Sequence, residues 1–145
     1  LDMIRLHLDQ QIDEISLADS TGMASPKQLS EFIYRVKELT KEIPIILHLH
    51  NTENKGYANL YAAIEAGVKI FDTAFGGLGG CPFIKSASGN IATEDAAHMI
   101  RQMGYSTGID IAKVAAVSHE MADKLQQPLQ GKLYTLIQRE DIKII

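Results

Sequence analysis

Two histidines, His48 and His50, are separated by one residue at the end of the apolar segment Ile45–Asn51. This run of β-forming residues predicts a buried strand. Because side chains alternate between the two faces of a strand, His48 and His50 share one face, while Leu47 and Leu49 occupy the other. Two imidazoles placed in this way can converge on a single metal ion. The alternative is that both are ordinary histidines of a core or its rim.

Other polar residues follow the predicted strands at the same end. Asp19 and Asp72 each come at the end of a predicted strand, and Asn90 lies at a fourth, short one. Ligands of α/β folds bind where parallel strands end, so we expect these residues on one rim with the histidines. The alternative for Asp19 and Asn90 is a turn residue that bonds its own backbone. Asp72 is interpreted as bracing its loop, without a catalytic role.

A glycine-rich segment, Gly76–Pro82, contains Cys81 and has four glycines in five residues. Such a segment cannot form regular structure. A cysteine is ordinarily a small buried apolar residue. With these neighbours, we instead expect an exposed thiol on a movable loop, which could close over a reaction and deliver the thiol.

The donor types define the metal that this rim would take. Two imidazoles and an amide oxygen, completed by a carboxylate or water, favour Mg²⁺ or Mn²⁺, with Zn²⁺ as a further option. Such an ion could act as a Lewis acid on a hydroxyl, carboxylate or carbonyl. Neighbouring Asn51 is expected to orient the histidines. The remaining histidines, His7, His98 and His119, fall in helical segments and are predicted to be surface residues.

The elements that must position these residues alternate between strand and helix. Strands are predicted at 12–18, 45–51, 68–73 and 88–91, with 132–137 as an added strand or extended tail; helices are predicted at 1–10, from Ser25-Pro26 onward, around 57–64, from Thr93 to Gly104, and from Asp110 onward. The helix that starts at Ser25-Pro26 begins with a capping box, Ser25 to Gln28. This order predicts parallel strands joined by helices.

About four β/α units are visible, whereas a (β/α)8 barrel has eight in ~250 residues. We therefore predict an α/β fold, the C-terminal half of a TIM barrel, over residues 1–126, followed by a tail or added strand over 127–145. The chain begins at Leu1, inside a predicted helix, so we expect the true N-terminus to be missing.

The composition is that of a soluble globular domain: 145 residues, 46% hydrophobic and 22% charged. A net charge of −4 without a basic cluster disfavours nucleic acid and anionic membranes as partners. No apolar run approaches the ~20 residues that cross a bilayer. The single cysteine suits a reducing compartment, so a cytoplasmic location is expected. The missing N-terminus leaves a mitochondrial address open.

Several motifs together resemble the hydroxymethylglutaryl-CoA lyases. They are the segments Glu14–Gly22, His48–Asn51, Gly77–Phe83 and Ala87–Asp95. These lyases belong to the metal-dependent TIM-barrel superfamily of isopropylmalate synthase, homocitrate synthase and the carboxyltransferase domain of pyruvate carboxylase. The His-x-His element is shared across that superfamily, whereas the Gly-Gly-Cys-Pro loop leading into Gly-Asn-Ile-Ala-Thr-Glu-Asp is particular to the lyases.

The resemblance implies a role for each matching residue. His48, His50 and Asn90 match the metal-binding residues, Cys81 the loop cysteine of proton transfer, and Asp19 an active-site carboxylate. The implied reaction cleaves 3-hydroxy-3-methylglutaryl-CoA to acetyl-CoA and acetoacetate, with His48 also expected to take part in catalysis. The implied partner is an acyl-CoA substrate, and the protein is expected to form a homo-oligomer or to be completed by the missing N-terminal half.

One departure from the family pattern limits this expectation. The family has an Arg-Asp pair at the end of its first barrel strand, where the Asp binds metal and the Arg stabilises the enolate, and no segment here matches it. We therefore expect negligible lyase activity from these 145 residues alone. Two alternatives stay open: a related acyl-CoA lyase or condensing synthase, and a non-catalytic half-barrel that binds metal.

Overall fold

The computed structural model describes residues 1–80 and 89–137. The chain divides into two compact units, Leu1–Asp72 and Thr73–Ile145, and each is described by itself. Cys81 and Ser88 lie outside the described residues. No helix in the described ranges combines the length and the apolar character that crossing a lipid bilayer requires.

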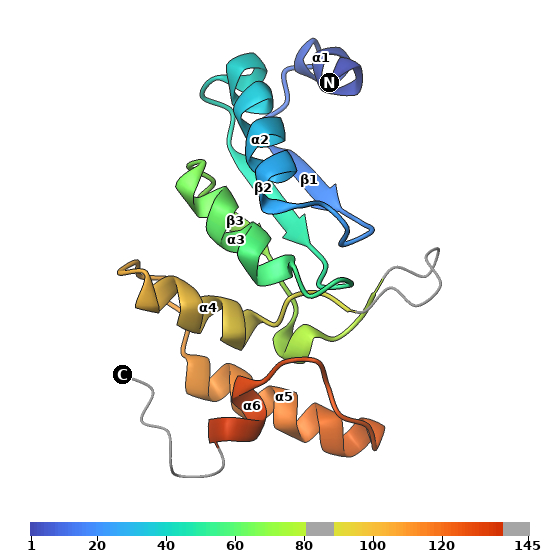
Figure 1. The fold of residues 1–145 in the computed structure, drawn as a ribbon, viewed down its shortest axis with the longest axis vertical. Coiled ribbons are helices and arrows are strands. Elements are labelled where there is room, and N and C mark those ends of the chain that lie inside the picture. Colours follow the sequence, from blue (N-terminus) through green and yellow to red (C-terminus); the bar gives the residue numbers. More distant parts are fainter. Residues whose placement is uncertain (81–88, 138–145) are drawn as a thin grey trace. The chain divides into compact units, whose positions relative to one another are not determined.

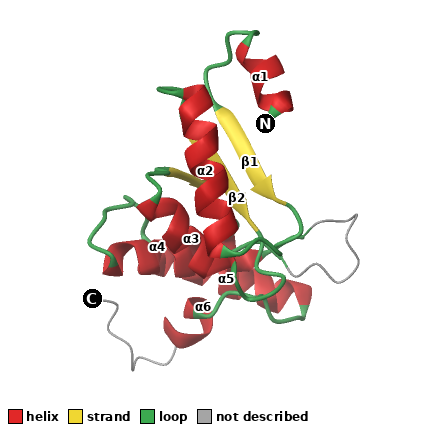
Figure 2. Cartoon of the chain, turned by 45° about the horizontal axis from the view of Figure 1, so that its top comes forward, coloured by secondary structure: helices red, strands yellow, loops and turns green. Residues whose placement is uncertain are grey.

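The first unit is a three-stranded parallel sheet with its connecting helices. The elements follow in the order α1 (Asp2–Leu8), β1 (Ile15–Asp19), α2 (Pro26–Thr40), β2 (Ile45–Leu49), α3 (Gly56–Glu65) and β3 (Ile70–Asp72). The strands lie in the order β1-β2-β3, and both pairs are parallel. Helices α2 and α3 cover the same face of the sheet (Figure 1, Figure 2), as two successive crossovers of one hand require.

Helix α2 starts where its sequence predicts. The Ser25 side chain accepts the Gln28 backbone N–H, and the Gln28 side chain accepts the Ser25 N–H, which completes the capping box, with Pro26 at the first helical position. Its apolar face buries Leu29, Ile33 and Val36. Helical spacing predicts that Phe32 belongs to the same apolar stripe, but it is 38% exposed.

Strand β2 is the centre of the sheet. Ile45, Leu47 and Leu49 are buried, whereas Ile46 and His48 are half-buried. The alternation predicted for this segment is therefore confirmed: Ile45, Leu47 and Leu49 lie on one face, and Ile46 and His48 lie on the other.

The second unit is mainly helical in its described part. It contains the short 3-10 turn η1 (Phe75–Gly77), α4 (Thr93–Gln102), α5 (Ile111–Leu125) and the four-residue α6 (Leu133–Leu136). A single parallel bridge joins Ala74 to Ala92. Ala97 and Ile111 pack on Leu133, so α6 is part of the core of this unit.

Three expectations for this unit need correction. In the described part of the strand predicted at 88–91, the structure has an isolated bridge residue at Asn90 in place of a strand, and the Ala74–Ala92 bridge follows just after it. The strand considered for 132–137 is wrong, since α6 occupies this segment. The Asp95 carboxylate accepts the backbone N–H groups of Lys132 and Leu133, each at 2.8 Å, and so satisfies the free donors of this helix start. The helical spacing of apolar residues in this segment predicts that Leu125 lies on the inner face of α5, but it is 43% exposed.

The fold class predicted from the sequence is otherwise confirmed: an α/β chain with parallel strands and helical crossovers. The described residues form three strands instead of four.

Candidate active site

The two histidines lie side by side at the C-terminal end of β2. Their ring centroids are 4.8 Å apart and the rings are nearly perpendicular, with an interplanar angle of 79°. His50 is buried, with 6% of its surface exposed. Two imidazoles this close can contact one small ion or one substrate group.

The hydrogen bond of His50 determines which ring nitrogen is free. Its Nδ1 lies 3.0 Å from the main-chain carbonyl oxygen of Asp19. A carbonyl oxygen can only accept, so Nδ1 must carry the hydrogen. The neutral ring then has its lone pair on Nε2, which is the arrangement of a metal-binding histidine.

His48 has a carboxylate neighbour instead. Its Nδ1 is 3.0 Å from Oδ2 of Asp72, which stands opposite His48 in the register of β2 and β3. Although the distance is short, the alignment is not that of a hydrogen bond, and the buried Nδ1 has no hydrogen-bond partner in the described part of the chain. The contact is thus an electrostatic one. It favours the proton on Nδ1 and the lone pair on Nε2.

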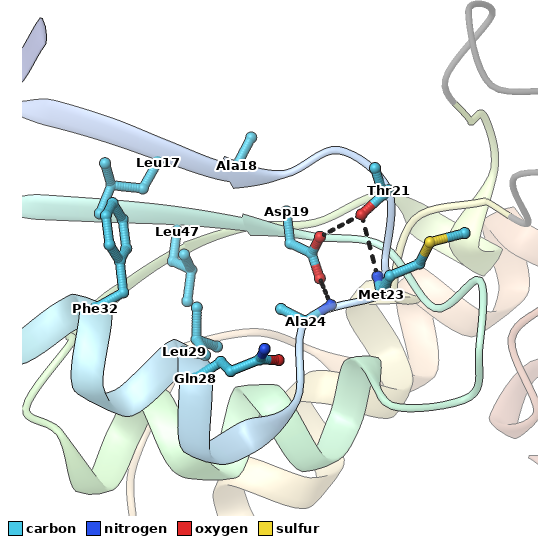
Figure 3. Close-up of a pocket in the computed structure, with 10 residues that line it drawn as sticks. All are labelled: Leu17, Ala18, Asp19, Thr21, Met23, Ala24, Gln28, Leu29, Phe32 and Leu47. Carbon is cyan, nitrogen blue, oxygen red and sulfur yellow. Dashed lines mark hydrogen bonds between the residues drawn. The ribbon is translucent and has the colours of Figure 1, made fainter. Parts of the chain in front are cut away.

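The carboxylate of Asp19 closes its own loop. Oδ1 accepts from the Gly22 N–H at 3.0 Å. Oδ1 also accepts from the Thr21 hydroxyl at 3.1 Å, and Oδ2 accepts from the Ala24 N–H at 3.1 Å (Figure 3). These are the bonds of a turn residue, the alternative considered for this position. The catalytic role of Asp19 stays a prediction, while its carbonyl group already holds His50.

The loop after Asp19 is also bound by residues of α3 and of the segment just before it. Lys55 donates to the carbonyl of Met23 at 2.7 Å, and the buried Asn59 donates to that of Ala24 at 2.9 Å. Asn51 was expected to orient the histidines, but its side chain accepts the Gly56 N–H at 2.9 Å, at the start of α3. Neither Lys55 nor Asn59 has a motif in the sequence that predicts its contact, because each partner is more than thirty residues away.

A hollow between β1 and the start of α2 opens on the opposite face of the sheet from His48. Figure 3 shows the Asp19 carboxylate at one end of it and Leu17, Leu47 and Phe32 along its wall. Because Leu47 and His48 point to opposite faces of β2, this hollow is separated from the histidine pair by the sheet.

Asn90 belongs to the second unit, where its carboxamide has a fixed orientation. Its Nδ2 donates to the carbonyl of Leu78 at 3.0 Å. Its Oδ1 is buried and lacks a hydrogen-bond partner among the described residues. A buried amide oxygen without a donor is costly unless a cation or a ligand satisfies it.

Each unit, taken by itself, has donor types that suit a divalent ion. The first unit has the adjacent imidazoles of His48 and His50, and in the second the Asn90 amide oxygen lacks a donor among the described residues. Among the described residues, no group of three or more His, Cys, Asp or Glu side chains is arranged so that it could hold a metal ion by itself. Cys81 cannot be placed against this site, since it lies outside the described residues.

A family model described as HMGL-like matches residues 7–121 of this chain. The chain belongs to the HMGL-like family. The match includes every residue singled out from the sequence as a candidate, among them Asp19, His48, His50, Cys81 and Asn90. Lyases of the HMGL-like family depend in general on divalent metal ions.

Individual relatives are lyases of CoA thioesters by name. The (R)-citramalyl-CoA lyase of Chloroflexus aurantiacus is 46% identical over 116 residues, which cover 80% of this chain and 37% of that protein. The cytoplasmic 3-hydroxy-3-methylglutaryl-CoA lyase of Rattus norvegicus is 41% identical over 104 residues, covering 70% of this chain and 29% of that protein.

A solved HMG-CoA lyase from Acinetobacter baumannii, in complex with coenzyme A and 3-methylmalate, has the same fold as this HMGL-like chain. The TM-score is 0.89 at 38% identity, over 99% of this chain and 47% of that one. The chain thus spans less than half the length of these relatives, and it matches part of their TIM barrel.

Proposed function

We propose that this chain carries the histidine pair of a lyase that cleaves a carbon–carbon bond of 3-hydroxy-3-methylglutaryl-CoA to give acetyl-CoA and acetoacetate. The observation that carries the proposal is the state of His50: its Nδ1 hydrogen is bound to the Asp19 carbonyl, which leaves Nε2 free beside the ring of His48. HMGL-like relatives named as CoA lyases support the reaction class.

His48, His50 and Asn90 are the residues that would hold the divalent ion, Mg²⁺ or Mn²⁺ in preference to Zn²⁺. When bound, such an ion supplies Lewis-acid polarisation of substrate oxygens. The contribution of this chain is orientation: the Asp19 carbonyl holds the ring of His50, the Asp72 carboxylate faces that of His48, and Leu78 holds the Asn90 amide.

The proposed reaction is a retro-Claisen cleavage. A base takes the proton of the tertiary hydroxyl, and this carbon becomes the ketone of acetoacetate as its bond to the thioester α-carbon breaks. The electron pair of that bond stays on the α-carbon as the enolate of acetyl-CoA, which then receives a proton. Cys81 is the proposed donor, and Asp19 and His48 are the proposed supporting groups of the proton transfers.

A second substrate is favoured by one observation: the relative at 46% identity is a citramalyl-CoA lyase by name. Both thioesters carry a hydroxyl, a methyl group and a carboxylate arm on the carbon that is released, and the arms differ by one methylene group. Because one methylene is worth ~1–3 kcal/mol in a binding pocket, a single site can distinguish the two only modestly.

Titration with Mn²⁺ tests the proposed metal site. Replacement of His50 by alanine should weaken binding at least about tenfold, since even partners of the ligands contribute this much. His119→Ala is the matched control, because this histidine lies on α5 and pairs only with Asp123 among the described residues. Equal affinities of wild type and His50→Ala would contradict the site.

Product analysis tests the substrate, using this chain together with the N-terminal half of the barrel. Acetoacetate from hydroxymethylglutaryl-CoA supports the first substrate, and pyruvate from citramalyl-CoA supports the second. Condensation of acetyl-CoA with a 2-oxo acid would identify a synthase instead. Metal binding without any of these products would favour a non-catalytic half-barrel.

A further inference from the structure

Glu94 is the one carboxylate that is fully buried in the described part of the chain, with 0% of its surface exposed. It lies in the first turn of α4, where its sequence position suggests only a favourable interaction with the helix dipole. Both of its oxygens accept the backbone N–H of Gly76, Oε1 at 3.1 Å and Oε2 at 3.0 Å. Burying a carboxylate is costly, so this arrangement calls for a function beyond helix capping.

Gly76 is held on its other side as well. Its carbonyl accepts the Gly131 N–H at 2.8 Å. Its φ of +59° is left-handed, and a Cβ on it would lie 2.3 Å from Cδ1 of Leu129. Gly131 also lies against the carboxylate, since a Cβ there would be 3.0 Å from Oε1 of Glu94. The turn η1 is thus held between the start of α4 and the segment before α6.

The residue that follows η1 holds the carboxamide of Asn90. Leu78 donates its N–H to the Phe75 carbonyl and accepts the Asn90 Nδ2 through its own carbonyl. Because Nδ2 is bound there at 3.0 Å, Oδ1 must face away from Leu78, and this oxygen is the buried atom without a described partner. A shift of η1 would therefore turn the amide.

We propose that Glu94 is a positioning residue for Asn90: its buried carboxylate fixes the N–H of Gly76, and through the turn to Leu78 it keeps the Asn90 oxygen turned away from Leu78, where this oxygen has no partner among the described residues. The effect on metal binding rests on the proposed function, which makes this oxygen a ligand. The effect on the orientation of the amide does not depend on it.

Nuclear magnetic resonance of the ¹⁵N-labelled chain tests the orientation without metal. In Glu94→Ala, we expect the side-chain amide signal of Asn90 to shift and the Gly76 N–H to exchange at least about tenfold faster, as loss of a hydrogen bond to a charged group predicts. Glu94→Gln keeps an acceptor oxygen and should restore most of both effects. A general loss of packing would not be rescued in this way.

Thr93→Val is the matched control. It removes the 2.8 Å bond between the Thr73 and Thr93 hydroxyls in the same helical turn, without touching Gly76. We expect it to leave the Asn90 signal in place. The proposal is overturned if Glu94→Ala also leaves that signal in place, or if Thr93→Val moves it equally. Should Glu94→Ala fail to fold, Glu94→Asp, which shortens the side chain and withdraws the carboxylate from the Gly76 N–H, is judged by the same two readouts.

Titration with Mn²⁺ then tests the consequence for metal binding. We expect the dissociation constant to rise about tenfold in Glu94→Ala and to recover in Glu94→Gln, as for other partners of metal ligands. If wild type binds Mn²⁺ but Asn90→Ala and His50→Ala bind it equally well, the proposed function fails, and the amide signal alone decides the role of Glu94. If only the Glu94 variants keep wild-type affinity, the link from Glu94 to the metal site is wrong.

Discussion

His48 and His50 are oriented by two oxygens of different kinds. The oxygen at His50 belongs to a main-chain carbonyl, and the one at His48 belongs to the Asp72 side chain, which is 62% exposed. An exposed side chain can rotate away and is screened by salt, whereas the carbonyl of a strand end cannot. His50 is therefore the more rigidly positioned of the two rings, and this rigidity suits a metal ligand.

Substitution of Cys81 should lower the rate of the reaction without changing metal binding. In an active enzyme completed by the N-terminal half, Cys81→Ala should lower turnover by ~10²–10⁴-fold, the usual contribution of a general acid or base. The affinity for Mn²⁺ should stay unchanged, because the proposed ligands are His48, His50 and Asn90. Steady-state rates and a Mn²⁺ titration check both halves of this prediction. A large loss of metal affinity would assign the thiol to the metal site instead.

Among the elements, α2 depends strongly on its first turn. Ser25→Ala removes the side-chain acceptor of the Gln28 N–H and should lower the free energy of unfolding by ~1 kcal/mol, the typical value of such a cap. Ser30 lies on the same helix, and its hydroxyl only returns to the Pro26 carbonyl. Ser30→Ala should therefore leave stability nearly unchanged. Urea unfolding of both variants tests the difference, and equal midpoints would contradict it.

Helix α5 should respond to acid through its capping residue. The Asp110 carboxylate accepts the Lys113 backbone N–H, and this bond lowers the pKa of Asp110 below its ordinary value of 3.8. Because its pKa is lowered by folding, Asp110 stabilises the folded state at pH values above 3.8. This stabilisation is lost as the pH falls through the folded-state pKa.

Asp110→Asn keeps the cap but cannot titrate. Its free energy of unfolding should therefore fall less steeply with acid than that of wild type, over the range from about pH 5 to about pH 2. Urea unfolding at several pH values measures the two slopes. Identical slopes would show that the carboxylate has no differential protonation.

Local signals in the sequence were sufficient to predict several elements. The capping box from Ser25 to Gln28 and the alternation along β2 involve near neighbours, so they can be recognised without tertiary structure. The helix α6 could not be recognised, because its first N–H groups are satisfied by Asp95, 37 residues away for Lys132. The burial of Glu94 likewise has no local signal, because the carboxylate is bound by the N–H of Gly76, 18 residues away.

The candidate site likewise has one contact that the sequence predicts and one that it does not. The closeness of His48 and His50 follows from spacing within one strand, and it was predicted. The contact between His48 and Asp72 depends on the register of β2 against β3, which the sequence does not determine. The placement of Asp72 at the end of a neighbouring parallel strand was the available signal, because opposite residues in register share a face.

At the scale of the whole molecule, β1 is an edge strand of the sheet in the first unit. In the described part of the chain, β1 pairs with β2 alone, and relatives in the HMGL-like family are more than twice as long as the matched segment. An edge strand presents unpaired N–H and C=O groups that another strand can bind. We expect this edge to pair with the N-terminal half of the barrel or with a second copy of the chain.

The chain alone should therefore show negligible cleavage of hydroxymethylglutaryl-CoA, since it has no Arg-Asp pair in a matching context. Addition of a separately produced N-terminal half should restore activity, and sedimentation or mass photometry should detect the complex. The chain with Arg35→Ala serves as the control, because this substitution lies on α2, outside the candidate site. We expect this variant to keep the fold and to behave like wild type. Robust turnover by the 145-residue chain on its own would refute the prediction.

The bond from His50 to the carbonyl of Asp19 determines what substitutions at position 19 can change. Every amino acid brings a carbonyl group, so no codon change at position 19 can delete the acceptor that selects the tautomer of this imidazole. Mutation there would remove the carboxylate that closes the loop and leave the acceptor in place. Substitution of Asp19 therefore affects the function of its side chain, whereas the main-chain acceptor for His50 is present with any residue at position 19.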